Sequence, residues 1–271
     1  MINYFLALSA PALLLILISI FIIISLTLLF ITQKYLRILI IDKHVEYGDI
    51  FTNSLAMIFG FIIGFIAVSV WESYNDLNNT VSKEANAIHN MYRTIEAYPA
   101  NTAEKGKEIL EDYVQEVIKK EWPLLSRDKF DPIAYKKLTL FYDLIVSFKP
   151  SDFAELAAHQ EMLNLLANYR ELRRDRVHNA KAILDPSIWL ALESSAFLFV
   201  LISCLFEMST MRIHIILISL LASGLAVVFF LLLMYNHPFM GPNAIQPEAF
   251  RMLLDFYWSK DPNVFEQQVS D

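Results

Sequence analysis

Side chains spaced by four residues along one uncharged stretch have the chemistry of a pore lining. Asn53, Met57 and Phe61 follow one another at this spacing, and Phe65 continues it. Residues four apart lie on the same side of an α-helix, one turn above another. Repeated around a symmetry axis they would form stacked rings, polar at Asn53 and apolar beyond it, and apolar rings gate channels by dewetting. These four residues are therefore predicted to line an ion pathway.

Small residues follow the same stretch at the same spacing. Ala56, Gly60 and Gly64 form a small-xxx-small pattern that contains a GxxxG motif. In lipid such a pattern lets helix backbones approach closely. The partner is either another span of the same chain or the equivalent helix of an identical subunit. Because one chain's spans enclose little room for a path, a ring of subunits makes a pore more simply.

One carboxylate interrupts the third apolar stretch. Glu193 stands there beside Ser194 and Ser195. A carboxylate in hydrocarbon costs about 2.5–3.5 kcal/mol, so this intramembrane acid should face protein or water, or carry a proton. A place in a pore vestibule and a structural hydrogen bond near the interface both remain open.

A basic run precedes that stretch and has two interpretations. It consists of Arg170, Arg173, Arg174 and Arg176 and is interleaved with Glu171 and Asp175. Such a run could bind anionic lipid head groups. We favour a solvated, salt-bridged helix face.

Catalytic and metal-binding patterns are nearly absent. The sequence contains no GxSxG, HExxH or GxxxxGK[ST] motif, and the SxxK match from Ser126 to Lys129 lies in a charged segment without partner motifs. His214 is expected to be an interfacial residue at a helix start. Cys204 is the sole cysteine and excludes an intrachain disulfide. We expect no enzyme activity, no cofactor and no metal, and no constellation for an enzyme acting on lipid can be assembled.

The elements that position these residues are membrane helices. The chain has 271 residues, of which 56% are hydrophobic, and its net charge is −7. The apolar residues concentrate in four stretches, each of about the 20 residues that a span needs: Leu6–Ile31, Phe51–Trp71, Pro186–Phe206 and Ile213–Tyr235. This composition excludes a soluble enzyme, a secreted disulfide scaffold and a nucleic-acid-binding protein. The first stretch is too long for a signal-peptide core and is interpreted as a retained anchor.

The polar region between the second and third spans is predicted to be helical. One face recurs at spacings of three and four: Trp71, Tyr74, Leu77, Val81, Ala85, Ile88, Tyr92 and Ile95. Further helices are expected over 102–121, capped by Thr102 and ended by Pro123; over 132–148, capped by Asp131; and over 151–183, capped by Ser151. The rods 50–98 and 151–183 would form an antiparallel stalk. The domains are then 1–71 (two spans), 72–185 (stalk), 186–235 (two spans) and 236–271 (tail).

Several short motifs resemble a bestrophin-like domain-of-unknown-function family of bacterial membrane proteins. They cover about 50–255 and are Trp71-x-x-Tyr74, Glu84-Ala-Asn-Ala87 with Met91-Tyr-Arg93, Tyr113 with Glu121-Trp-Pro123, Arg170 to Arg174, Pro186-x-x-Trp189, His237-Pro-Phe-x-Gly241 and Pro247-Glu248. The resemblance implies an all-α membrane protein whose four transmembrane helices carry a helical stalk domain between the second and third.

A remoter similarity is to the bestrophins themselves. Gly60-Phe61, nine residues and Trp71-x-x-Tyr74 resemble the end of their pore-lining second helix. That resemblance implies a homopentameric anion channel, with chloride as an ion and with Met57 and Phe61 in its neck. Asn53 departs from the pattern because bestrophins have an apolar residue there. No acidic cluster matches the calcium clasp of animal bestrophins.

Charge gives conflicting indications of orientation. The short loop 32–50 holds Lys34, Arg37 and Lys43, which places the stalk outside by the positive-inside rule, whereas the basic residues before the third span place it inside. With the bestrophin resemblance, we expect a cytosolic stalk in a bacterial inner membrane. The expected partners are a second copy of the chain, membrane lipids and inorganic anions. The alternative function is a non-conducting scaffold or signalling protein that binds a partner through 72–185.

Overall fold

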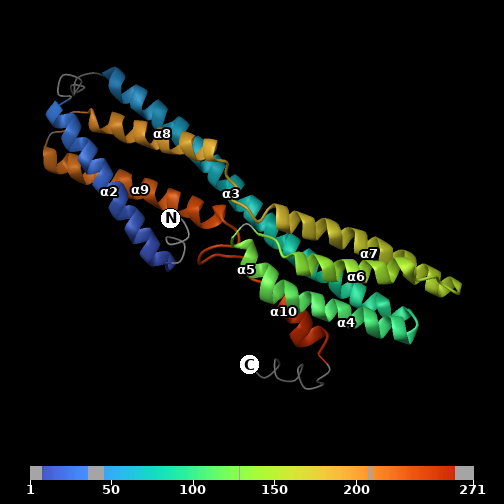
Figure 1. The fold of residues 1–271 in the computed structure, drawn as a ribbon. Coiled ribbons are helices and arrows are strands. Elements are labelled where there is room, and N and C mark those ends of the chain that lie inside the picture. Colours follow the sequence, from blue (N-terminus) through green and yellow to red (C-terminus); the bar gives the residue numbers. More distant parts are fainter. Residues whose placement is uncertain (1–7, 36–45, 128, 207, 209, 260–271) are drawn as a thin grey trace, which may run out of the picture. The chain divides into compact units, whose positions relative to one another are not determined.

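The computed structural model describes residues 8–35, 46–127, 129–206, 208 and 210–259, with side chains from residue 53 onward in the second of these ranges. All regular elements in these ranges are helices (Figure 1). The chain divides into two compact units, one of residues 1–74 and 182–244 and the other of residues 75–181 and 245–271. The expected all-α class is confirmed.

Four helices are long and apolar enough to cross a membrane, and all contribute to the first unit. They are α2 (Ala10–Tyr35), the first half of α3 (Glu46–Thr94), α8 (Pro186–Cys204) and α9 (Met211–Asn236). Pro186 occupies the first turn of α8, where the missing N–H is not needed. Thr210 caps α9 by accepting from the Ile213 amide at 3.4 Å. The four expected spans are confirmed, with bounds that shift by a few residues.

The first unit is held by apolar contacts among these four helices. The α2 helix packs along α9, where the Phe21 and Phe229 rings lie 5.2 Å apart. The α3 helix joins this core through Ile63 and Val70, which are buried. One face of α3 is therefore used within the chain.

The last residue of α9 and the segment after it close the first unit with hydrogen bonds. Asn236 accepts from the amides of Ile183 and Leu184 through its carbonyl and its side-chain oxygen, at 3.0 and 2.7 Å. The Tyr74 hydroxyl donates to the Asn243 carbonyl at 2.7 Å. Gly241 has a φ of 84°, which a side chain would disfavour, and this explains the glycine in the His237–Gly241 motif.

The second unit is a helical bundle with a short C-terminal addition. It contains the second half of α3, then η2 (Ile95–Ala97), α4 (Ala100–Glu116), the π-helix η3 (Val117–Glu121), α5 (Trp122–Leu125), α6 (Pro132–Ser147), α7 (Phe153–His178), α10 (Glu248–Met252) and the π-helix η4 (Leu253–Tyr257). The predicted face of α3 is buried from Leu77 to Ile95, whereas Trp71 is half exposed.

Two of the predicted boundaries around α4 are wrong. The helix begins at Ala100 after Pro99, and no side chain caps it, so Thr102 is not the cap. Pro123 does not end the helical run. The π-helix η3 follows α4 directly, and α5 then extends the run to Leu125. A proline cannot donate the α-helical bond to the carbonyl four residues back. The π-turn accommodates it, since the Trp122 amide donates to the Val117 carbonyl five residues back.

The predicted cap of α6 is confirmed, whereas the predicted cap of α7 is wrong. Asp131 caps α6 by accepting from the Ile133 amide at 2.9 Å, as predicted. Asp152 rather than Ser151 caps α7, accepting from the Glu155 amide at 2.8 Å, while Ser151 donates to the Glu155 carboxylate. The α7 helix ends at His178 instead of 183, so it does not run unbroken into α8.

Candidate functional site

Three of the predicted pore-lining side chains lie on an open face of α3, and the fourth, Asn53, also lines a cavity with residues of α8 and α9. Met57, Phe61 and Phe65 are 80%, 76% and 70% exposed, more than any other large hydrophobic side chain described in the first unit. Asn53 is exposed at the start of the same stripe. The core-forming Ile63 points elsewhere, so the stripe and the core occupy different faces of the helix.

The two glycines beside this stripe have empty space next to them. A methyl group added at Gly60 or Gly64 would meet no described atom within 4 Å, and Ala56 is partly buried. The close approach that these glycines permit is therefore not used by the described spans of the same chain.

Glu193 lies in a different part of the first unit. It projects from α8 at a cavity of about 150 Å³ whose other lining residues come from α2, α8 and α9, and Ser25 is the polar neighbour there. No α3 residue lines this cavity. The structure therefore does not bring Glu193 together with Asn53, Met57, Phe61 and Phe65.

Buried ionic contacts form a second site. It lies in the second unit, residues 75–181 and 245–271, which we call the stalk unit. Arg176 donates from Nε to Glu84 Oε2 at 2.6 Å, and from Nη2 to Glu84 Oε1 at 3.1 Å and to Glu121 Oε2 at 3.0 Å. Arg173 donates to the other oxygen of Glu121. We call these four residues the ionic cluster. It joins α3, η3 and α7, and its two positive and two negative charges balance.

The groups around Arg176 in the ionic cluster stabilise its charged form. Trp122 and Phe250 lie beside Arg176, with ring centroids 4.9 and 5.9 Å from the guanidinium carbon. Burial lowers the pKa of Arg176, but the carboxylates of Glu84 and Glu121 outweigh it, so the pKa is raised and the group stays charged. Among the described residues, Arg173 Nε and Arg176 Nη1 have no hydrogen-bond partner.

The prediction of a solvated arginine face is wrong for half of the run. Arg173 and Arg176 are buried, whereas Arg170 and Arg174 are exposed. A signal was present in the sequence, because the buried residues Met162, Leu166, Tyr169, Arg173 and Arg176 recur at spacings of three and four. The two arginines continue an apolar stripe, and that pattern could have identified them.

The remaining chemistry-bearing residues of the sequence are a cysteine, a histidine and the serine of the SxxK match. Cys204 is buried on α8. His214 lies at the start of α9, as expected, and is buried there, with Nε2 3.2 Å from the Ser203 carbonyl oxygen. Ser126 donates to the Pro123 carbonyl at 2.8 Å. No group of three or more metal-ligating side chains occurs in the part of the chain that the structure describes.

Comparison with solved structures identifies the fold. Two crystal structures of membrane-protein variants have TM-scores of 0.60 and 0.61 and are each 15% identical; the alignments cover 88% and 91% of this chain and 94% and 99% of theirs. A crystal structure of a bacterial bestrophin homologue from Klebsiella pneumoniae has a TM-score of 0.59 at 14% identity, covering 91% of this chain and 99% of its own. The bestrophin-like fold is confirmed.

Comparison at the sequence level identifies the family. Curated proteins give no match to the chain. The family model of the bestrophin-like domain matches residues 19–250. These residues include α3, the ionic cluster and all of the motifs on which the resemblance rests; the first turns of α2 lie outside the match. Because the match spans most of its length, this chain belongs to the bestrophin-like domain family.

Proposed function

We propose that the chain assembles into a homo-oligomeric ion channel with α3 around the central axis. The observation that carries this proposal is the exposed stripe of Met57, Phe61 and Phe65 beside Gly60 and Gly64, whose sides are open. The bestrophin resemblance favours five subunits, and each would contribute one copy of the stripe.

Lipid contact alone explains this face of α3 less well. Exposed leucines such as Leu190 on α8 and Leu220 on α9 are sufficient for a helix that faces lipid. The α3 face adds the polar Asn53 in line with the stripe and two glycines that leave the backbone uncovered. Small residues serve packing between helices in lipid, and a neighbouring subunit supplies the missing helix.

The chemistry of such a neck favours anions modestly. Rings of Met57 and Phe61 carry no charge that could hold an ion, so ions pass only while the neck stays wet. Weakly hydrated anions lose water at lower cost than small cations, and the edges of aromatic rings are partly positive. We expect anion selectivity without sharp discrimination among halides.

The alternative function, a non-conducting scaffold that binds a partner, depends on apolar side chains exposed on the stalk. Its α6 helix exposes Ile133, Leu140 and Val146, which could contact either a neighbouring subunit or another protein. A scaffold requires no current, whereas the channel requires one, so electrical recording separates the two functions.

The test is planar-bilayer recording of the purified full chain under a chloride gradient. The wild type should reverse near the chloride equilibrium potential. Met57→Ala with Phe61→Ala should raise conductance or abolish closing, because both apolar rings are cut. Leu190→Ala with Leu220→Ala is the matched control, since it removes two exposed leucines outside α3, and it should leave the current unchanged.

Two results would contradict the proposal in different ways. Reversal at the cation potential would overturn the selectivity but keep the channel. Silence of both the wild type and the α3 double variant, in a preparation shown to be oligomeric, would favour the scaffold.

A further inference from the structure

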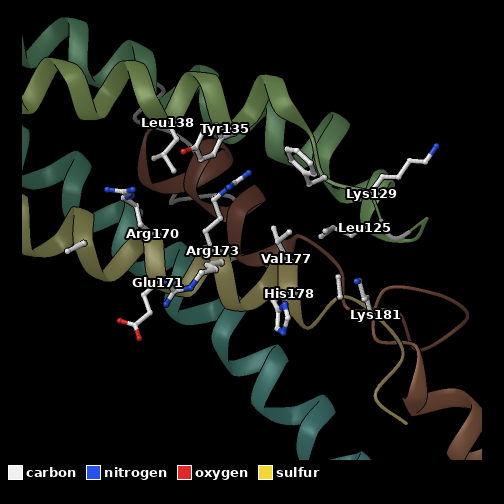
Figure 2. Close-up of a pocket in the computed structure, with 14 residues that line it drawn as sticks. Leu125, Lys129, Tyr135, Leu138, Arg170, Glu171, Arg173, Val177, His178 and Lys181 are labelled. Carbon is white, nitrogen blue, oxygen red and sulfur yellow. The ribbon is translucent and has the colours of Figure 1, made fainter. Parts of the chain in front are cut away.

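A cavity in the stalk unit lies between α6, α7 and the segment after α5. Its volume is about 790 Å³, within the range of roughly 300–1,000 Å³ typical of small-molecule sites. Figure 2 shows Tyr135 and Leu138 of α6 on one side and Arg170, Arg173 and Val177 of α7 on the other. Every residue that lines the cavity belongs to this one unit.

The charge of this cavity is opposite to that of the chain. Its lining includes the basic residues Lys129, Arg170, Arg173, Arg174 and Lys181, against one acid, Glu171, in a protein of net charge −7. Figure 2 shows the Glu171 carboxylate directed away from Tyr135 and Leu138. The imbalance is therefore local and concerns the walls of one cavity.

Most of these positive charges form no ion pair with the carboxylates that the structure describes. Arg173 is balanced by Glu121 in the ionic cluster. By contrast, none of the described carboxylates forms an ion pair with Lys129, Arg170, Arg174 or Lys181. Unpaired cations around a concave site attract an anion, and guanidinium groups match the oxygens of phosphate in bidentate geometry.

A buried donor marks the inner wall. The side chain of Arg173 is 10% exposed and lines the cavity, and its Nε has no partner among the described residues. Buried polar groups without a partner are uncommon in native proteins, and an unoccupied binding site is one explanation. The ionic cluster fixes this arginine in place, so the wall is preorganised.

The opposite wall would suit an apolar group. Phe130, Tyr135 and Leu138 line it, and Leu125 and Val177 add further apolar lining to the cavity. Sites for organic ligands combine such apolar walls with a few placed polar groups. A halide would leave these apolar side chains uncovered.

From this arrangement we infer that the cavity binds a phosphorylated organic anion, with the phosphate at Arg170 and Arg174 and the apolar group against Phe130 and Tyr135. The same chemistry is offered by a soluble phosphate monoester and by the head group of an anionic lipid. The sequence position of the cavity is consistent with a lipid head group, because Lys181 precedes the membrane helix α8 by five residues.

The test measures binding of radiolabelled phenyl phosphate to the full chain in phosphatidylcholine nanodiscs by equilibrium dialysis. We expect saturable binding of one phenyl phosphate per chain at micromolar to millimolar concentration. Arg170→Gln with Arg174→Gln should raise the Kd at least tenfold, which corresponds to about 1.4 kcal/mol. Both arginines are exposed, so the melting temperature should stay at the wild-type value.

Two further variants make the test specific. Lys83→Gln with Arg251→Gln removes the same two charges from exposed positions of the same unit outside the cavity, and it should leave the Kd unchanged. Arg170→Lys with Arg174→Lys keeps the charge and should recover part of the affinity. A cavity variant that binds as well as the wild type, or a control that loses binding equally, would overturn the inference.

A second nanodisc composition distinguishes the two sources. If a lipid head group occupies the cavity, adding phosphatidic acid should raise the apparent Kd for phenyl phosphate in the wild type and leave the Arg170/Arg174 variant unaffected. An unchanged wild-type Kd would assign the cavity to a soluble phosphate. Absence of saturable binding in phosphatidylcholine alone overturns the inference. None of these measurements needs a current, so the result is independent of the proposed channel.

Discussion

At the scale of single residues, the ionic cluster is the most demanding feature of the stalk unit. Arg176 and Glu84 are fully buried, and the guanidinium meets two carboxylates from different helices. Desolvating such charges costs several kcal/mol per ion, which only good geometry and charge balance offset. The cluster is therefore most sensitive to the loss of one member.

We predict that Arg176→Met lowers the free energy of unfolding by about 3–5 kcal/mol, because Glu84 and Glu121 would remain buried with only Arg173 between them. Thermal unfolding of the full chain in detergent measures the change. Arg251→Gln is the control, since the Arg251–Glu248 pair is exposed and should contribute about 0–1 kcal/mol. Similar melting temperatures for the two variants would contradict a stabilising role of the cluster.

At the scale of elements, α3 has several tasks along one uninterrupted helix. Its 49 residues rise roughly 70 Å at 1.5 Å each. One segment carries the exposed stripe, Ile63 and Val70 join the core of the first unit, and Glu84 enters the ionic cluster of the second. Helical periodicity keeps the stripe on a different face from the core residues, and Glu84 follows Val70 further along the helix.

The glycines of α3 give a prediction at this scale. Gly60→Leu and Gly64→Leu should each reduce the oligomer in native mass spectra, because leucine would separate the subunits, while the fold persists in the space left open. Gly224→Leu is the matched control: its glycine on α9 is also open within 4 Å, but it lies outside α3. Intact oligomers for both α3 variants would argue against an interface there.

At the scale of the whole molecule, an even number of membrane spans is expected to bring the segment after α9 back to the membrane side on which the stalk lies. The contacts within the second unit agree with this count. Trp258 stacks on Tyr92 at 4.3 Å and donates to His89 at 3.2 Å, and Trp122 donates to the Ile245 carbonyl at 2.9 Å. Residues after α9 thus complete the stalk unit.

We predict that this side is cytosolic, because the basic residues of α7 lie close in sequence to the third span. The only native cysteine is buried, so a Cys204→Ser background allows single labelling sites. In right-side-out vesicles, an impermeant maleimide should label Met208→Cys, in the turn before α9, and label Ser82→Cys only after permeabilisation. The reverse pattern would place the stalk outside.

Local patterns in the sequence determined the four membrane spans, the cap at Asp131 and the buried face from Leu77 to Ile95, because each depends on composition or periodicity within a few turns. They also placed Asn53, Met57, Phe61 and Phe65 on one helix face. The periodicity of α7 carried a signal for the burial of Arg173 and Arg176, but their ionic partners were decided only by the tertiary structure, since Glu84 precedes Arg176 by 92 residues and no local rule pairs them. The continuation of the helix past Pro123 and the open sides of Gly60 and Gly64 likewise depend on backbone geometry and on contacts between helices distant in sequence, which short-range spacing does not encode.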